Sequence, residues 1–507
     1  MPKVQELIAQ QGVFYQKHFC TVAWCCPSRV NFLTGRAAHN TNVTSGSLPF
    51  GGWRKFLDEG LNDKYLPVWL NNIGIRTYYV GKLLNGFKKQ NLAGSTYPKG
   101  WTNSSLLIDP WTYFYYGSRW TNDGDGTYDT FPDTHTTDVT QSKALDMLDE
   151  AANSGDQFFM MVAPVAPHQD LSHGVKPPPV PAKYKGKFDG RKVPRTENFN
   201  PDVASGASWV KNLPKLSAKK LEVGDKTFQD RLGNIAAIDD MVGELIQKLD
   251  DHGILNNTFV VYTSDNGFHI GNHRLKPGKR CPYEEDINIP LLIRGPNVAK
   301  GMNSTITNSH TDMAPTILQM LGVPLQDDFD GAPIAYTAEE LRGSNKSELV
   351  NVEFWNAVAT PIGVAAHEYY NNTYKALRLM SDDNSFFYST WCNGEREFYD
   401  MKTDAQQMHN RLAEHPTGRS IEYYNRTEQE LFNRLDALLM VTKSCKMDSC
   451  RDPWMTLFPG GEVTDIQTAM NTTYDTFFEN QPKISFSSCV KGHVVSQEGP
   501  QEVMAFK

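Results

Sequence analysis

The sequence predicts an α/β protein, because strand and helix patterns alternate along most of its length. Residues 75–80, 157–163 and 258–262 are short runs rich in β-branched and aromatic side chains, which favour buried strands. Helical patterns lie between them, and 228–249 is the clearest, with apolar residues recurring on one stripe. Such alternation is typical of a sheet with parallel strands.

The other elements of this region are expected in a similar order. We predict the end of a helix at 4–10, a strand at 12–15, a helix at 65–72, a packed aromatic hairpin at 111–120, a helix at 137–152, a strand at 289–294 and a helix at 312–321. Between 171 and 215 the periodicity gives way to a long loop rich in Pro, Lys and Gly, and long loops in compact domains are often functional.

The pattern changes beyond residue 345. The expected elements there are strands at 373–378 and 385–389, the segment 397–400, a turn, a helix at 427–441 and a packed tail. A chain of 507 residues is too long for one core. We therefore expect a larger domain at 1–345 and a smaller α+β domain at 346–507.

Composition argues against two kinds of partner. A net charge of −8 lacks the basic footprint of a nucleic-acid-binding protein, so no nucleic-acid partner is expected. No run of about eighteen apolar residues occurs, so no membrane span is expected. Because the net charge is negative, an anion-binding site must depend on groups close to it and not on the overall charge.

Cysteines and glycosylation sequons point to the secretory route, with an extracellular or lysosomal or vacuolar destination. None of the eight cysteines belongs to a paired zinc motif, and Cys445 and Cys450 are spaced to close a short disulfide loop. Asn-x-Ser/Thr sequons begin at Asn42, Asn103, Asn256, Asn303, Asn345, Asn371, Asn425 and Asn471. Residues 1–10 show no signal peptide, so we expect the first stretch of the natural protein to be missing from this chain.

Residues 25–36, Cys-Cys-Pro-Ser-Arg-Val-Asn-Phe-Leu-Thr-Gly-Arg, carry the strongest chemical signal. Pro27 suits the first turn of a helix and Ser28 can satisfy a free N–H group there, so a helix should begin near Cys25. The exposed N–H groups and the helix dipole favour an anion beside residue 25. Arg29 lies one turn further along the same face, where its charge can reach that anion.

Three more candidate residues follow the carboxyl ends of predicted strands. Lys82 follows 75–80, His168 follows 157–163 and Asp265 follows 258–262. Taken alone, Asp-Asn-Gly after a strand is more typical of a turn, and a histidine after a proline is more typical of a loop. Ligands of parallel sheets lie beyond the carboxyl ends of the strands, so we expect the three side chains to share one site.

In these segments the chain resembles a sulfatase of the alkaline-phosphatase-like superfamily, in the group of N-acetylglucosamine-6-sulfatases and fungal arylsulfatases. The resemblance rests on the C-x-P-S-R signature at Cys25 and on segments in the family's order, at 81–85, 166–168, 262–267, 279–284 and 397–404. It implies a large mixed sheet flanked by helices, a smaller C-terminal α+β domain, and a sulfuric ester hydrolase of the arylsulfatase type.

The resemblance also implies the cofactor chemistry. A formylglycine-generating enzyme would oxidise Cys25 to formylglycine, whose hydrate attacks the ester of a sulfated small molecule or a sulfated sugar. Asp265, Asn266 and residue 25 would bind one divalent cation. We expect Ca²⁺, a hard ion that prefers oxygen ligands.

Roles for the remaining site residues follow from the same resemblance. Arg29, Lys82 and Lys279 would hold the sulfate oxygens and neutralise charge as the transition state forms. His168 would contact the sulfate and help to protonate the leaving alcohol. His269 and His273, near the expected metal ligands, are further candidates for contact with the substrate.

Two departures from the family pattern affect these expectations. Many sulfatases have a histidine at the position of Leu84, so the base for the elimination step is unassigned. The family also has an Asp-Asp pair at the end of its first strand, whereas no aspartate precedes Cys25. We therefore expect an N-terminally incomplete sulfatase, with an open slot and unpaired backbone groups in its sheet, weak metal binding and poor turnover.

Two other functions stay open. A phosphomonoester or phosphonate hydrolase would use the same fold, although Pro-Ser-Arg after the cysteine favours the sulfatase. A catalytically silent, secreted glycan-binding relative would fit the missing aspartates. The joint presence of Lys82, His168, Asp265 and Lys279 argues against a decayed site.

Overall fold

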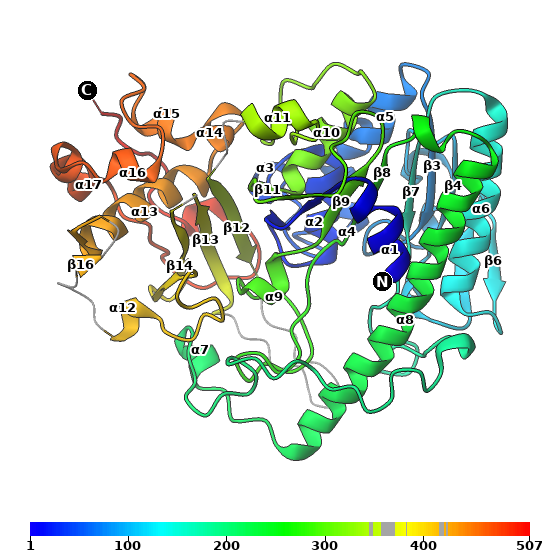
Figure 1. Ribbon diagram of the computed structural model, residues 1–507, viewed down its shortest axis with the longest axis horizontal. Coiled ribbons are helices and arrows are strands. Elements are labelled where there is room, and N and C mark those ends of the chain that lie inside the picture. Colours follow the sequence, from blue (N-terminus) through cyan, green and yellow to red (C-terminus); the bar gives the residue numbers. More distant parts are fainter. Residues whose placement is uncertain (344–347, 356–370, 382, 415–419, 422–423, 507) are drawn as a thin grey trace.

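The computed structural model describes residues 1–343, 348–355, 371–381, 383–414, 420–421 and 424–506. A larger part, blue to green in Figure 1, lies beside a smaller part coloured yellow to red. The larger part is mixed α/β and the smaller part carries an antiparallel sheet with helices, which confirms the predicted fold class. The predicted boundary between residues 345 and 346 lies outside the described residues.

The larger part is built on two sheets. A parallel sheet has the strand order β4-β3-β7, and a mixed sheet has the order β10-β1-β9-β8. Their bounds are β1 Val13–Tyr15, β3 Arg76–Gly81, β4 Asn103–Leu106, β7 Phe158–Ala163, β8 Val260–Thr263, β9 Leu291–Arg294 and β10 Met302–Ser304.

Not all of these strands are parallel, which agrees with the mixed sheet that the family resemblance implies and corrects the parallel arrangement expected from the alternation of strands and helices. Strand β9 runs antiparallel to both β1 and β8, with Leu292 opposite Tyr262. A parallel return needs a crossover of a dozen or more residues, usually a helix. The connection from β8 to β9 contains a single short helix, α9 Glu284–Ile287, and is otherwise loop. The chain therefore returns antiparallel, and the long connection between β8 and β9 can contribute residues to the candidate site.

Helices cover the sheets on both sides (Figure 1). The longer ones are α2 Cys25–Thr34, α6 Thr136–Ser154, α8 Ala218–Asp251 and α10 Met313–Met320. The shorter ones are α1 Pro2–Leu7, α3 Ala38–Thr41, α4 Gly52–Asp58, α5 Leu66–Asn71, α7 Ser208–Lys211 and α11 Ala338–Gly343. Helix α8 begins ten residues before the predicted start at 228, because its first turns extend beyond the apolar stripe that predicted it.

Two small two-stranded pairs, one parallel and one antiparallel, complete this part. Strand β2 His18–Phe19 pairs with β11 Asn308–Ser309, and β5 Ser118–Thr121 pairs with β6 Tyr128–Phe131. The predicted hairpin at 111–120 is therefore only partly correct, because Trp111–Tyr113 forms a single 3₁₀ turn.

The smaller part is an antiparallel sheet of β12 Leu349–Trp355, β13 Thr373–Met380, β14 Ser385–Trp391 and β15 Arg396–Asp400. One face packs on α13 Glu428–Thr442, where Leu377 meets Leu435 in one core cluster. The other face shares a core with the larger part, in which Val352 and Phe354 join Phe19. Both faces of this sheet are therefore buried, and one of them packs against the segment just before α2.

The end of the chain packs against the same sheet, as expected for a tail. Its short elements are α12 Arg411–Glu414, β16 Ser420–Ile421, β17 Arg426–Thr427, α14 Asp448–Arg451, α15 Pro453–Leu457, α16 Ile466–Ala469 and α17 Asp475–Asn480. The predicted disulfide Cys445–Cys450 is present, and a second one joins Cys392 to Cys489. In the described parts of the chain, none of the helices has the length and apolarity required to cross a membrane.

Candidate active site

Cys25 stands at the first position of α2, as the sequence predicts. The preceding residue, Trp24, is extended at φ −150°, and the helix then runs to Gly35, whose φ of +66° ends it. The thiol is only 2 % exposed. Free N–H groups of the first helical turn surround such a position and favour negative charge. No side chain caps this helix start, so the predicted capping role of Ser28 is wrong.

Three basic side chains from distant segments meet at this thiol. Lys279 Nζ lies 2.8 Å from Cys25 Sγ. Burial and the carboxylate of Asp265 alone would raise the pKa of the thiol, but Lys279, Lys82 and a hydrogen bond with His168 hold that pKa well below its usual value. The surroundings of residue 25 therefore stabilise an anion.

Strand ends bring Lys82 and His168 to the site. The backbone N–H of Lys82 donates to the carbonyl of Ala163 at 2.9 Å, which joins the carboxyl ends of β3 and β7. His168 follows β7, and its Nδ1 lies 2.9 Å from the carbonyl of Gln169. That carbonyl favours a hydrogen on Nδ1 and leaves Nε2 for Cys25. Burial lowers the pKa of His168 below its usual value.

Arg29 reaches across to Asp265 instead of pointing into open space. Its Nε donates to Asp265 Oδ2 at 2.9 Å, and its Nη1 donates to the carbonyl of Lys82 at 2.5 Å. Burial would raise the pKa of Asp265, but Arg29, Lys279 and Lys82 hold it well below its usual value. The carboxylate is therefore ionised at any working pH and links α2 to the end of β8.

Asp265 and Asn266 are the predicted metal ligands from the β8 loop. Asp265 Oδ2 is bonded to Arg29, and Asn266 Oδ1 accepts from Lys279 Nζ at 3.1 Å. Ca²⁺ takes about six to eight oxygen ligands. These two side chains, both already bonded to cations, do not make a calcium site by themselves.

Ser28 and His310 form a contact that the sequence did not predict. Ser28 Oγ donates to the backbone carbonyl of Asp265 at 2.5 Å and lies 2.9 Å from His310 Nδ1. Among the described residues, His310 Nε2 has no hydrogen-bond partner. Ser28 therefore fastens α2 to the β8 loop. Ser28 belongs to the signature, where the sequence predicted a different role for it, and nothing in the sequence singled out His310.

His269 and His273 are both buried behind the site. His269 Nδ1 pairs with Asp286 at 2.8 Å, and its backbone bonds on both sides to Gly278, the residue before Lys279. His273 stacks on Tyr283 with ring centroids 4.2 Å apart. Neither residue lines the cavity described below. Both instead support the loop that carries Lys279.

His273 predicts acid sensitivity of the fold. Burial, with the nearby His269, lowers the pKa of His273 to about 3, whereas an unfolded chain has the ordinary value near 6.5. Below pH 6.5 His273 binds a proton in the unfolded state but stays neutral in the folded state, so the free energy of unfolding falls as pH falls. Urea denaturation should show a loss of about 2 kcal/mol from this residue between pH 6.5 and 5.

The substitution His273→Gln should remove this loss of about 2 kcal/mol between pH 6.5 and 5, so unfolding free energy should depend less steeply on pH. His173→Gln is the matched control, because the His173 side chain is exposed. Equal slopes in wild type and His273→Gln would contradict the prediction.

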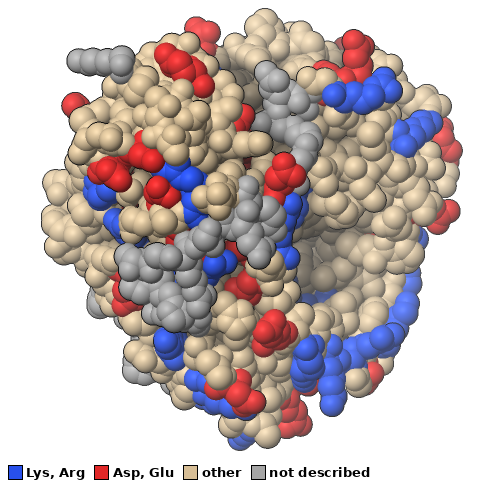
Figure 2. Space-filling view, turned by 60° about the vertical axis from the view of Figure 1, so that its left-hand side comes forward, with Lys and Arg blue, Asp and Glu red and all other residues tan. Residues whose placement is uncertain are grey.

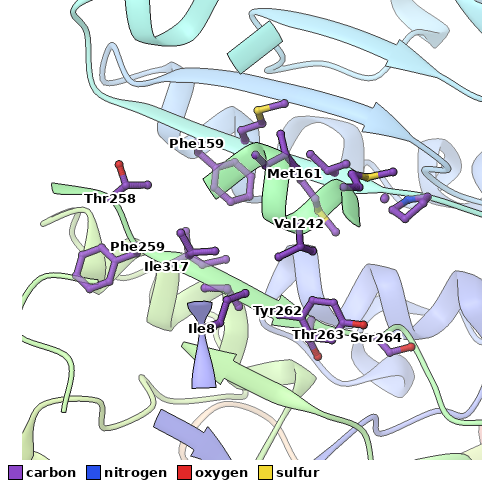
Figure 3. Close-up of a pocket in the computed structure, with 18 of the residues that line it drawn as sticks. Ile8, Phe159, Met161, Val242, Thr258, Phe259, Tyr262, Thr263, Ser264 and Ile317 are labelled. Atoms are coloured by element: carbon purple, nitrogen blue, oxygen red, sulfur yellow. The ribbon is translucent and has the colours of Figure 1, made fainter. Parts of the chain in front are cut away.

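An apolar cavity of about 1060 Å³ opens between β7 and β8, each the last strand of its sheet. In Figure 3, Phe159 and Met161 line one side and Phe259 and Tyr262 the other. The side chains of Phe158–Val162 are only partly buried for this reason. The same cavity is also lined by the candidate site residues Arg29, Lys82, His168, Asp265, Asn266 and Lys279.

The molecular surface is hollowed on the face shown in Figure 2, and basic side chains gather along the lower rim of the hollow. Basic groups around a depression attract anions locally, even on a protein with a net charge of −8.

Comparison with known proteins gives two family matches. The family described as Sulfatase matches residues 1–323, which is more than half of the chain. The family described as N-sulphoglucosamine sulphohydrolase, C-terminal, matches residues 271–435.

Curated relatives agree with these matches. An arylsulfatase of Volvox carteri is 31 % identical over 541 aligned residues, covering 100 % of this chain and 80 % of its own. The sulfatase ppz1 of Metarhizium majus is 38 % identical over 79 % of this chain and 87 % of its own. An N-acetylglucosamine-6-sulfatase of Bos taurus is 29 % identical over 89 % of this chain and 81 % of its own.

Solved structures share the fold. One, in complex with its substrate D-glucosamine-2-N,6-O-disulfate, has a TM-score of 0.68 at 22 % identity and covers 87 % of this chain and 92 % of its own. A phosphonate monoester hydrolase from Silicibacter pomeroyi has a TM-score of 0.60 at 19 % identity, with coverage of 82 % and 87 %.

Proposed function

The chain belongs to the sulfatase family, which hydrolyses sulfate esters, and from this premise we propose that it cleaves the ester of a sulfated sugar with a nucleophile formed at Cys25. The observation that carries the proposal is the meeting of Lys279, Lys82 and His168 at the Cys25 side chain, on a helix N-terminus. These groups stabilise negative charge where a sulfate would be attacked.

The nucleophile depends on a modification of residue 25. Sulfatases generally carry formylglycine there, and a formylglycine-generating enzyme is the partner we propose for this chain. When Cys25 carries formylglycine, its hydrated aldehyde supplies the attacking oxygen. The helix N-terminus and Lys279, 2.8 Å from Sγ in the unmodified side chain, then favour the ionised form of that oxygen.

Basic side chains hold the sulfate. Lys279 and Lys82 approach residue 25 from two separate loops, so they can bind different sulfate oxygens and neutralise the charge that grows during attack. Arg29 contributes its charge from one helical turn away while bonded to Asp265. Because cations hold Asp265 ionised, it is a weak base, and we assign it to orienting Arg29 more than to taking a proton.

His168 serves the leaving alcohol. Its Nδ1 is bonded to the Gln169 carbonyl, so Nε2 faces the reacting groups. Burial lowers the pKa of this ring, so the imidazolium formed when Nε2 takes up a proton is a stronger acid than usual and passes that proton readily to an alkoxide. Leu84, at the position where many sulfatases have a histidine, is 3 % exposed within the apolar core and takes no part in proton transfer.

Ca²⁺ is the ion we propose for the metal position. Asp265, Asn266 and the oxygen at a modified residue 25 would supply about three of the six to eight oxygens that Ca²⁺ takes. The described residues do not complete such a site, and no step above depends on the ion.

The proposed substrate is a 6-sulfated glucosamine or an aryl sulfate. Relatives named N-acetylglucosamine-6-sulfatase and arylsulfatase align over most of the chain, and a solved structure with this fold holds a sulfated glucosamine. We place the sugar first, because the solved structure with its sulfated sugar has the same fold over 87 % of this chain.

We propose the secretory route as the location. Both disulfides favour an oxidising compartment. Sequon asparagines Asn256, Asn303 and Asn471 are exposed, as glycan attachment requires. Two relatives are named extracellular sulfatases.

Turnover of three probes tests the proposal. Protein produced with a formylglycine-generating enzyme should hydrolyse glucosamine 6-sulfate and nitrophenyl sulfate faster than nitrophenyl phosphate. A preference for the phosphate would instead favour a phosphomonoester or phosphonate hydrolase. No turnover, together with glycan binding that Cys25→Ala does not change, would favour a catalytically silent binder.

A further inference from the structure

Tyr113 lies between two of the basic groups at the candidate site. It ends the 3₁₀ turn Trp111–Tyr113 and is 8 % exposed. Its ring centroid is 4.4 Å from that of His168, with the planes tilted by 38°. On the same ring, Lys82 Nζ lies 4.8 Å from the centroid. One aromatic side chain therefore contacts both the imidazole and the ammonium.

The Tyr113 hydroxyl and the backbone around Tyr113 form hydrogen bonds with the two loops that carry Lys82 and His168. Asn85 Nδ2 donates to Tyr113 Oη at 2.7 Å, so residues 82–85 hold both the face and the tip of the ring. The backbone N–H of Leu171 donates to the Tyr113 carbonyl at 3.2 Å. Tyr115 Oη donates to the His168 carbonyl at 2.6 Å. The segment thus ties the loop after β3 to the loop after β7.

An ammonium at a buried aromatic face is attracted to the ring and is held away from water. Among the described residues, no carboxylate forms an ion pair with Lys82, which is 2 % exposed. The Tyr113 ring therefore helps to fix the direction of its charge, together with the attraction of the Lys82 ammonium to Cys25 and Asp265. Stacking limits rotation of the His168 ring in the same way.

We propose that Tyr113 is a positioning residue for sulfate-ester hydrolysis. Its ring holds the side chains of Lys82 and His168 at fixed positions around the sulfate. This inference rests on the proposed function. Burial and the neighbouring Cys25 raise the pKa of the phenol well above its usual value, so the hydroxyl stays neutral and adds no charge to the pocket.

Two substitutions separate the ring from the hydroxyl. Tyr113→Leu removes the ring and should lower kcat by about 10- to 100-fold, because a misplacement of about 1 Å at a reacting group costs up to that much. KM should rise by about fivefold, in line with the weaker sulfate binding expected below, and Tyr113→Phe should restore kcat and KM to within about threefold of wild type. Formylglycine content and thermal unfolding are measured for each variant.

Trp111→Leu is the matched control from the same turn. The Trp111 ring packs on the Arg119 guanidinium, 3.6 Å from its centroid, and not on Lys82 or His168. Its kcat should equal that of wild type. Equal activity of Tyr113→Leu and wild type would overturn the proposal, and so would an equal loss in Tyr113→Phe and Tyr113→Leu.

Binding of inorganic sulfate keeps this test separate from the proposed function. If wild-type protein hydrolyses no sulfate ester, the proposed function fails, but calorimetry still reports on the position of Lys82 and His168. Tyr113→Leu should then bind sulfate about fivefold or more weakly than wild type and Tyr113→Phe. Equal affinities in all three proteins would overturn the positioning role.

Discussion

Replacing Cys25 with alanine is expected to abolish hydrolysis of sulfate esters, with a fall in kcat of more than about 10⁴-fold. The reason is that the substitution removes the thiol that the proposed formylglycine-generating enzyme would oxidise, while Lys279, Lys82, His168 and Asp265 all stay in place. Substrate binding should therefore survive far better than turnover. Steady-state kinetics on nitrophenyl sulfate and calorimetry with inorganic sulfate measure the two separately.

Cys26→Ala is the matched control for this prediction. Cys26 is the neighbouring cysteine, fully buried in the core, and it occupies the free second position of C-x-P-S-R. Its loss should cost some stability but leave kcat within about threefold of wild type. Mass spectrometry of the peptide around residue 25 should show the aldehyde in Cys26→Ala and in wild type. Normal turnover by Cys25→Ala, or a free thiol at Cys25 in active protein, would contradict the assignment.

Much of the site could be predicted because strand ends are easy to locate. The apolar runs that became β3, β7 and β8 stop within one to five residues of Lys82, His168 and Asp265, and parallel strands bring their carboxyl ends to one edge. The signature at Cys25 added a helix N-terminus from residue types alone. Both arguments need only local patterns, so they hold without knowledge of long-range packing.

Other features depend on contacts that local patterns do not encode. The antiparallel return of β9 follows from a long loop, whose path no periodicity describes. The Ser28–His310 contact joins residues 282 positions apart, and Tyr113 reaches His168 from an unrelated turn. The Cys392–Cys489 disulfide likewise links the end of β14 to a poorly patterned tail. Pairings of this kind become visible only when the chain is folded.

Lys279 was identified only by the family resemblance, and the structure places it in direct contact with Cys25. Its Nζ contacts Cys25 Sγ at 2.8 Å and Asn266 Oδ1 at 3.1 Å, so its charge faces the position of nucleophilic attack. Lys279→Ala should lower kcat/KM by about 10²- to 10³-fold, the usual cost of losing one group that stabilises the transition state. Steady-state kinetics with nitrophenyl sulfate measures the loss.

Lys276→Ala supplies the control, since Lys276 is a half-buried lysine three residues earlier on the same loop, without a contact to Cys25. It should keep kcat/KM within about threefold of wild type, which separates loss of a charge in the loop from loss of the charge at the site. A longer-range role for net positive charge would lower both variants equally and would also depend on ionic strength. A short-range role predicts that only Lys279→Ala is impaired, at low and high salt alike, because the buried contact is poorly screened.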